Sequence, residues 1–167
     1  MTQQLQVVLD LLRLRAGPQD LPHDLRYTLA VLLLFVVQAV LTTEALAEAS
    51  GTESEVGNNL LSTALQFVAI AALLFYRRRP ERLQQTVLAL AATGIALNLL
   101  AFPLLLQSNP NQNQPLLLLL WLGLFGWSLA VKGNILRHAL DVELPIAMLI
   151  VVMLLALSFL ALELAFL

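Results

Sequence analysis

The chain has 167 residues, of which 59% are hydrophobic and 12% are charged, and its formal net charge is −2. Soluble domains hold about 45–50% apolar and about 25% charged residues, so this composition excludes an ordinary water-facing globule and predicts a membrane protein. A slight negative charge argues against nucleic-acid binding, and the lack of cysteine excludes disulfides, thiolate metal sites and thiol catalysis.

The first predicted element is a short amphipathic helix over residues 3–15. Its apolar residues recur at i, i+3, i+4 and i+7 from Leu5, and Gly17-Pro18 ends it. We interpret it as a helix lying in the membrane interface with its two arginines near the lipid headgroups. The alternative is that it packs on the bundle or on a partner. Residues 1–24 are thus predicted to form a cytoplasmic helix and a Gly/Pro connector, in which Asp20 or Asp24 caps the next helix.

The rest of the chain, residues 25–167, is predicted to be a bundle of five transmembrane helices. Each apolar run is about 20 residues long, which is enough to cross a hydrocarbon core of about 30 Å. The predicted fold class is therefore an all-α integral membrane protein, with the interfacial helix at its N-terminal end. The predicted spans are residues 25–47, 60–76, 83–106, 116–136 and 146–167.

The distribution of basic residues predicts the orientation of the bundle. With five spans and a cytoplasmic N-terminus, all nine lysines and arginines fall on or near the cytoplasmic side. The loops predicted on the other side, residues 48–59 and 107–115, contain none. Cytoplasmic loops of membrane proteins carry an excess of Lys and Arg, so the C-terminus is expected on the opposite, periplasmic side.

A cluster of arginines follows the second predicted span directly. It consists of Arg77, Arg78, Arg79 and Arg82. One interpretation is a binding site for anionic lipid headgroups or an anionic partner. The other, which we favour, is an ordinary cytoplasmic anchor.

Four residues are predicted to place polar groups near the middle of the membrane: Gln38, Gln66, Asn98 and Trp127. One interpretation is a pocket for a quinone, a lipid headgroup or a translocated solute. The other, which we favour, is hydrogen bonding between helices, with Asn98 or Gln66 accepting from the Trp127 indole. This preference depends on the expectation that no ionisable residue lies at the membrane centre, because Glu44, Glu163 and Lys132 are expected near the ends of their helices, where they reach water by extending.

Small residues on the third and fourth spans predict close helix packing. They are Gly94, Gly123, Gly126 and Ala130. Gly126 and Ala130 have the small-x-x-x-small spacing that lets a neighbouring helix approach closely.

Catalytic motifs are not found in the sequence. There is no phosphate-binding loop, zinc-protease motif or nucleophile elbow, and no paired carboxylates are expected at the membrane centre. His23 and His138 fall on predicted connectors, where they are not placed to hold a haem across the bundle. We therefore predict no enzymatic activity, no metal site and no cofactor.

The two-tryptophan stretch 121–127, the connector 137–145 and the apolar run to Leu167 resemble the Yip family of membrane domains. Residues 11–22 are similar to the start of small proteobacterial inner-membrane proteins of this shape. The resemblance implies a five-span protein of the bacterial inner membrane. It supplies no catalytic residues.

These observations predict a non-enzymatic structural or accessory subunit that associates with other membrane proteins or with itself, and with anionic membrane lipids. The alternative is a small transporter or a lipid- or quinone-binding protein that uses a mid-membrane polar pocket. The two predictions differ in whether Gln38, Gln66, Asn98 and Trp127 line one connected cavity.

Overall fold

The structure is a computed structural model, and it describes residues 2–51, 53, 55–107 and 114–165. These residues form α-helices and two short 3-10 helices, and no strand is found among them. In chain order the elements are α1 (Thr2–Leu12), η1 (Pro18–Asp20), α2 (Leu25–Ser50), α3 (Val56–Tyr76), η2 (Pro80–Arg82), α4 (Leu83–Gln107), α5 (Pro115–Leu140) and α6 (Leu144–Ala165).

Helices α2 to α6 are the five that are long and apolar enough to cross a membrane, which confirms the number and order of the predicted spans. Three of them extend clearly beyond the predicted spans: α2 continues to Ser50, α3 begins at Val56 and α5 continues to Leu140. A helix continues until its backbone finds a cap, and this point need not coincide with the last apolar residue. The polar connector predicted between the third and fourth spans lies mostly outside the described residues, as do two positions of the connector between the first and second spans.

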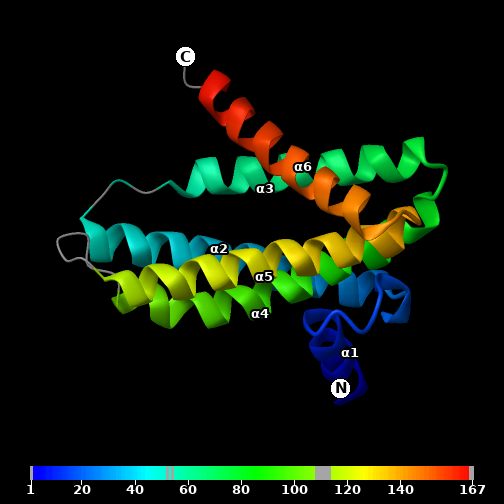
Figure 1. The fold of residues 1–167 in the computed structure, drawn as a ribbon, viewed down its shortest axis with the longest axis horizontal. Coiled ribbons are helices and arrows are strands. Elements are labelled where there is room, and N and C mark those ends of the chain that lie inside the picture. Colours follow the sequence, from blue (N-terminus) through cyan, green and yellow to red (C-terminus); the bar gives the residue numbers. More distant parts are fainter. Residues whose placement is uncertain (1, 52, 54, 108–113, 166–167) are drawn as a thin grey trace.

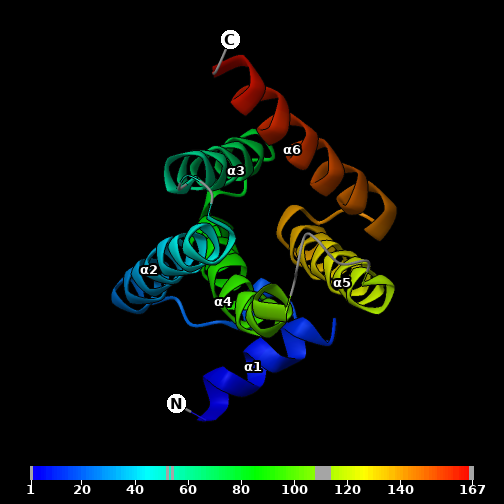
Figure 2. The same cartoon turned by 90° about the vertical axis from the view of Figure 1, so that its left-hand side faces the viewer.

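The spanning helices form two layers. Figure 1 shows α2, α4 and α5 side by side, with α3 and α6 above them and α6 crossing α3 at an angle. Figure 2 looks along the helices and shows α1 on the far side of α4 and α5 from α3 and α6. The most extensive contacts join α2 with α4, α5 with α6, and α4 with α5.

The sequence predicted a capping residue for one helix, α2, and the structure confirms one of its two alternatives. The Asp24 carboxylate accepts the backbone N–H groups of Arg26 (2.9 Å) and Tyr27 (3.4 Å), so it caps α2 as one of the two predicted alternatives. Asp20 instead accepts the backbone N–H of Gly17 at 2.9 Å. The C-terminal end of α5 is capped by Asp141, whose backbone is in the left-handed conformation with a φ of 57°.

The N-terminal segment packs on the bundle at its C-terminal end. Leu11 and Leu12 of α1 and Leu21 after η1 are buried in one cluster with side chains of α4 and α5. Earlier in α1, Leu5 and Leu9 are exposed, at 63% and 42%. The packing contact that the sequence left as an alternative is therefore made, while the first turns of α1 keep apolar side chains uncovered.

Three side chains of the spanning helices bind the backbone of this segment. The Trp127 indole N–H donates to the Leu12 carbonyl at 2.9 Å. The amides of Asn134 and Gln85 donate to the carbonyls of Ala16 (3.0 Å) and Leu21 (2.7 Å). These carbonyls lie at and beyond the end of α1, where the helix supplies no partner. The hydrogen bonds therefore fix residues 12–21 against α4 and α5.

Candidate functional site

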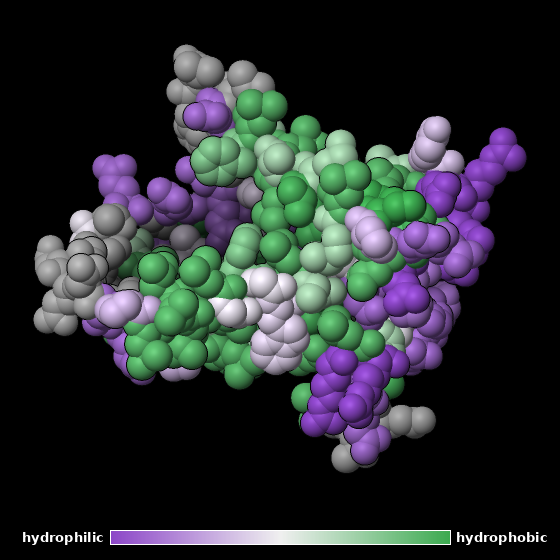
Figure 3. Space-filling view, in the orientation of Figure 1, coloured by the Kyte–Doolittle hydropathy of each residue, from purple (hydrophilic) through white to green (hydrophobic). Residues whose placement is uncertain are grey.

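A cavity of about 350 Å³ lies between the spanning helices, with walls from α2 to α6. Ligand pockets usually measure about 300–1,000 Å³, so this one has room for a small molecule. Figure 3 shows the surface hollowed between α3 and the layer of α2 and α5, with hydrophilic residues inside the hollow. The polar residues that line the cavity are Thr42, Asn59, Ser62, Thr63, Gln66, Asn98, Ser128 and Lys132.

Helix α3 supplies half of this polar lining because its polar residues share one face. Asn59, Ser62, Thr63 and Gln66 are spaced i, i+3, i+4 and i+7, which places them on a single stripe. The rest of α3 is largely apolar, as a helix in contact with lipid must be. This periodic stripe can be recognised in the sequence. It was overlooked because only residues expected near the middle of the membrane were considered.

The four predicted mid-membrane residues divide into two groups. Gln66 and Asn98 line the cavity. Gln38 does not: its amide N–H donates to the Ile95 carbonyl of α4 at 3.1 Å, which is a bond between helices. The Gln38 carbonyl oxygen is buried and has no partner within the described part of the chain.

Trp127 is also outside the cavity, and the prediction that Asn98 or Gln66 accepts its indole N–H is wrong. The acceptor is the Leu12 carbonyl of the N-terminal segment. The reason is rotation about the α5 axis: successive helical residues are about 100° apart, so Trp127 and Ser128 face different neighbours. Trp127 meets residues 12–21, and Ser128 meets the cavity.

Lys132 also lies farther from the end of its helix than the sequence predicted. It was expected near the inner end of its helix, but α5 continues for eight residues beyond it, to Leu140. Lys132 therefore lies about 12 Å along the axis from that end, since a helix rises about 1.5 Å per residue. Its side chain lines the cavity together with Ser128 and Leu136, one turn to either side. The error arose because the end of the apolar run was taken as the end of the helix.

Within the described part of the chain, no carboxylate in the cavity balances the charge of Lys132. No Asp or Glu is among the described residues that line the cavity. Within the same part of the chain, no side-chain hydrogen bond or ion pair is found for Lys132, Gln66 or Asn98. Ionisable residues inside a membrane are rare and usually mark functional sites. A lysine and two amides that line one cavity therefore make that cavity the candidate site.

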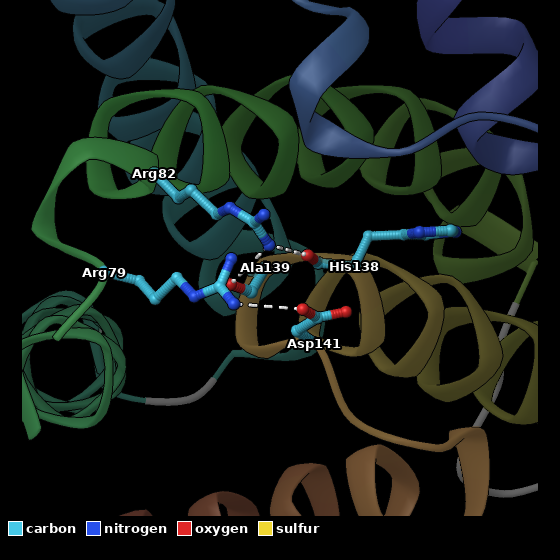
Figure 4. Close-up of polar contacts among 5 residues, drawn as sticks. All are labelled: Arg79, Arg82, His138, Ala139 and Asp141. Atoms are coloured by element: carbon cyan, nitrogen blue, oxygen red, sulfur yellow. Dashed lines mark hydrogen bonds and ion pairs between the residues drawn. The ribbon is translucent and has the colours of Figure 1, made fainter. Parts of the chain in front are cut away.

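The arginine cluster is divided between two roles (Figure 4). Arg79 forms an ion pair with Asp141 at 3.0 Å, and Arg82 donates to the carbonyls of His138 (2.7 Å) and Ala139 (3.4 Å). These two arginines fasten the corner between α3 and α4 to the end of α5. Arg77 and Arg78 are exposed. Of the four candidate lipid contacts, these two make no such side-chain contact with the residues that the structure describes.

The predicted packing residues differ in how closely another helix approaches them. A Cβ added at Gly94 would lie 2.7 Å from the ring of Phe35, so α2 and α4 depend on a glycine at this position. A Cβ added at Gly123 or Gly126 meets no described atom within 4 Å. Ala130 is partly buried. Among the three glycines, Gly94 is thus the one that mediates close packing within the chain.

No group of three or more potential metal ligands is found among the described residues.

Replacing Asn98 by leucine is expected to change the thermal stability little. Its amide makes no hydrogen bond within the described residues, so the substitution breaks none. The thermal unfolding midpoint of the purified variant in lipid nanodiscs measures this effect. A fall comparable to the loss of an interhelical hydrogen bond, about 0.6–2 kcal/mol, would instead show that Asn98 ties helices together.

No protein-family model matches the chain, and no curated protein or solved structure matches it either. The resemblance to the Yip family therefore stays a prediction. The function has to be argued from the cavity and its residues.

Proposed function

We propose that this multi-pass membrane protein binds a small polar or amphipathic molecule in the cavity between its spanning helices, as a ligand-binding protein or small transporter without enzymatic activity. One observation carries the proposal: Lys132, Gln66 and Asn98 line the same cavity. Polar groups in a membrane are costly unless they are paired, so groups left without protein partners favour a ligand or water as the partner.

The contrast with Gln38 supports a binding role over a purely structural one. Gln38 lies near the middle of α2 and makes the bond to a neighbouring helix that a structural role requires. Gln66 and Asn98 make no such bond within the described residues and face the cavity. Retaining these amides without a packing role is costly, and ligand binding accounts for that cost.

We place the protein in the bacterial inner membrane, with α1 and η2 on the cytoplasmic side. The elements that carry all the basic residues except Lys132 meet at one end of the bundle, the right-hand end in Figure 1. An excess of Lys and Arg is typical of cytoplasmic ends. In this orientation α1 lies at the inner interface, and Arg77 and Arg78 are placed to contact anionic lipid headgroups.

A second candidate function is that of an accessory subunit, through the outer half of α5. The supporting observation is the open surface at Gly123 and Gly126, where an added Cβ meets no described atom within 4 Å. Small residues on a lipid-facing surface let another helix approach closely. The partner in this role would be another membrane protein or a second copy of the chain.

The cavity can be tested by cysteine labelling, because the chain has no native cysteine. Ser128→Cys is expected to react with a small water-soluble thiol reagent in nanodiscs, since Ser128 lines the cavity. Ser158→Cys is the matched control: Ser158 is 2% exposed and also donates to its own helix backbone, but it is outside the cavity. Equal, negligible labelling of both variants would contradict a solvent-accessible binding cavity.

A further inference from the structure

The cavity contains one positive charge and, among the described residues, no negative charge. Lys132 supplies a compact ammonium group, which in water is strongly hydrated. Ser128, one turn before it, donates its hydroxyl to the Phe125 carbonyl at 2.7 Å, so that hydroxyl proton is already used. Burying a charge is unfavourable unless an opposite charge or hydrogen-bonding groups compensate for it. A ligand that brings one negative charge would supply this compensation.

Two amides add hydrogen-bonding capacity from other walls of the cavity. Gln66 comes from α3 and Asn98 from α4, whereas Lys132 comes from α5. Each amide carries two N–H donors, and an ionised acid group accepts at several lone pairs. Hydrogen bonds to ionised groups are roughly twice as strong as those between neutral groups. Three helices therefore each contribute a hydrogen-bond donor to the wall of the same cavity.

Apolar side chains from several helices also line the cavity, beside further hydroxyl and amide groups, and its volume limits the size of the ligand. Phe35 and Phe67 line the cavity with their rings edge to face, 6.2 Å between centroids, and Leu97 and Leu154 line other parts of it. A volume of about 350 Å³ is near the lower limit for ligand pockets. The space suits one short apolar chain rather than a whole two-chain phospholipid.

We propose that the cavity selects a small monoanion with one apolar tail, whose acid group is bound by Lys132 with Gln66 and Asn98. A medium-chain carboxylate is the simplest member of this class, whereas a monoalkyl phosphate carries the same tail with a charge of about −1.5 to −2 at neutral pH. This proposal rests on the function proposed above, that the cavity binds a ligand.

The test is equilibrium dialysis of radiolabelled octanoate against the full chain in lipid nanodiscs at neutral pH, with empty nanodiscs as the blank for lipid partitioning. We expect saturable binding that unlabelled octanoate displaces and that octanol and octylamine do not. Octyl phosphate as a competitor distinguishes a preference for carboxylate from one for phosphate.

Variants connect the binding to the lysine. Lys132→Met should weaken octanoate binding at least about tenfold, because it removes a charge-assisted contact. Lys132→Arg should retain most of the affinity. Arg137→Met is the matched control, since Arg137 is exposed and lies outside the cavity. Size-exclusion profiles and unfolding midpoints show that each variant is folded.

Two results would overturn the proposal: octanol or octylamine competing as well as octanoate, or folded Lys132→Met binding octanoate like the unmodified chain. Labelling of Ser128→Cys separates these failures from failure of the proposed function. If Ser128→Cys is labelled while charge selectivity is absent, the cavity binds molecules but does not select anions. If it is not labelled, both proposals fail.

Discussion

Replacing Gly94 by leucine is expected to destabilise the bundle clearly. Even the first carbon of a side chain at this position would lie 2.7 Å from the Phe35 ring. Moving that ring away would also disturb its edge-to-face contact with Phe67. Overpacking of this kind costs about 1–3 kcal/mol or more, whereas removing a helical glycine returns only about 1 kcal/mol. The unfolding midpoint in nanodiscs should therefore fall.

The matched controls are Gly123→Leu and Gly126→Leu, which make the same change on α5. A side chain added there meets no described atom within 4 Å, so both variants should unfold at or slightly above the original midpoint. A Gly94→Leu variant as stable as these controls would contradict the close contact between α2 and α4. Loss of an oligomer in the controls, with each chain still folded, would support the accessory-subunit candidate.

Replacing Arg82 by methionine is expected to cost about 1.5–3 kcal/mol of stability, the usual range for hydrogen bonds to charged groups. Its guanidinium donates to the carbonyls of His138 and Ala139 in the last turn of α5 (Figure 4). These carbonyls lie where a helix runs out of backbone partners and where its dipole favours a positive charge. The denaturation midpoint of the variant in mild detergent measures the loss.

Two comparisons make this prediction specific. Arg77→Met removes the same charge from an exposed position and should have little effect. Asp141→Asn breaks the ion pair with Arg79. The side chain of Arg79 is 36% exposed and that of Asp141 is 69% exposed, and exposed ion pairs contribute about 0–1 kcal/mol to stability. If Arg82→Met were no worse than Arg77→Met, the cluster would be an anchor for lipid headgroups and not a structural clamp.

The number, type and order of the spanning helices were predictable from the sequence. Lipid offers no partners for backbone N–H and C=O groups, so a run of about 20 apolar residues has to form a helix whatever surrounds it. The cap at Asp24 was predictable for a similar reason, because its hydrogen bonds reach only two and three residues ahead. Properties determined by neighbours along the chain can be derived from the chain alone.

The composition of the candidate site could be predicted only in part. Gln66 and Asn98 were identified because amides in a membrane need an explanation, and both line the cavity. Gln38 belonged to the same set by composition, yet it bonds to α4. Lys132 was missed because α5 extends beyond its apolar run.

Composition and hydropathy thus determined that the chain contains five helices long and apolar enough to span a membrane. Only the tertiary structure decided which face of each helix meets which neighbour. Trp127 and Ser128 are adjacent in sequence, but a rotation of about 100° directs one to the N-terminal segment and the other to the cavity. That rotation is set by the packing of all the helices together. For this reason the pocket around Lys132 emerges from the fold and not from any single stretch of the chain.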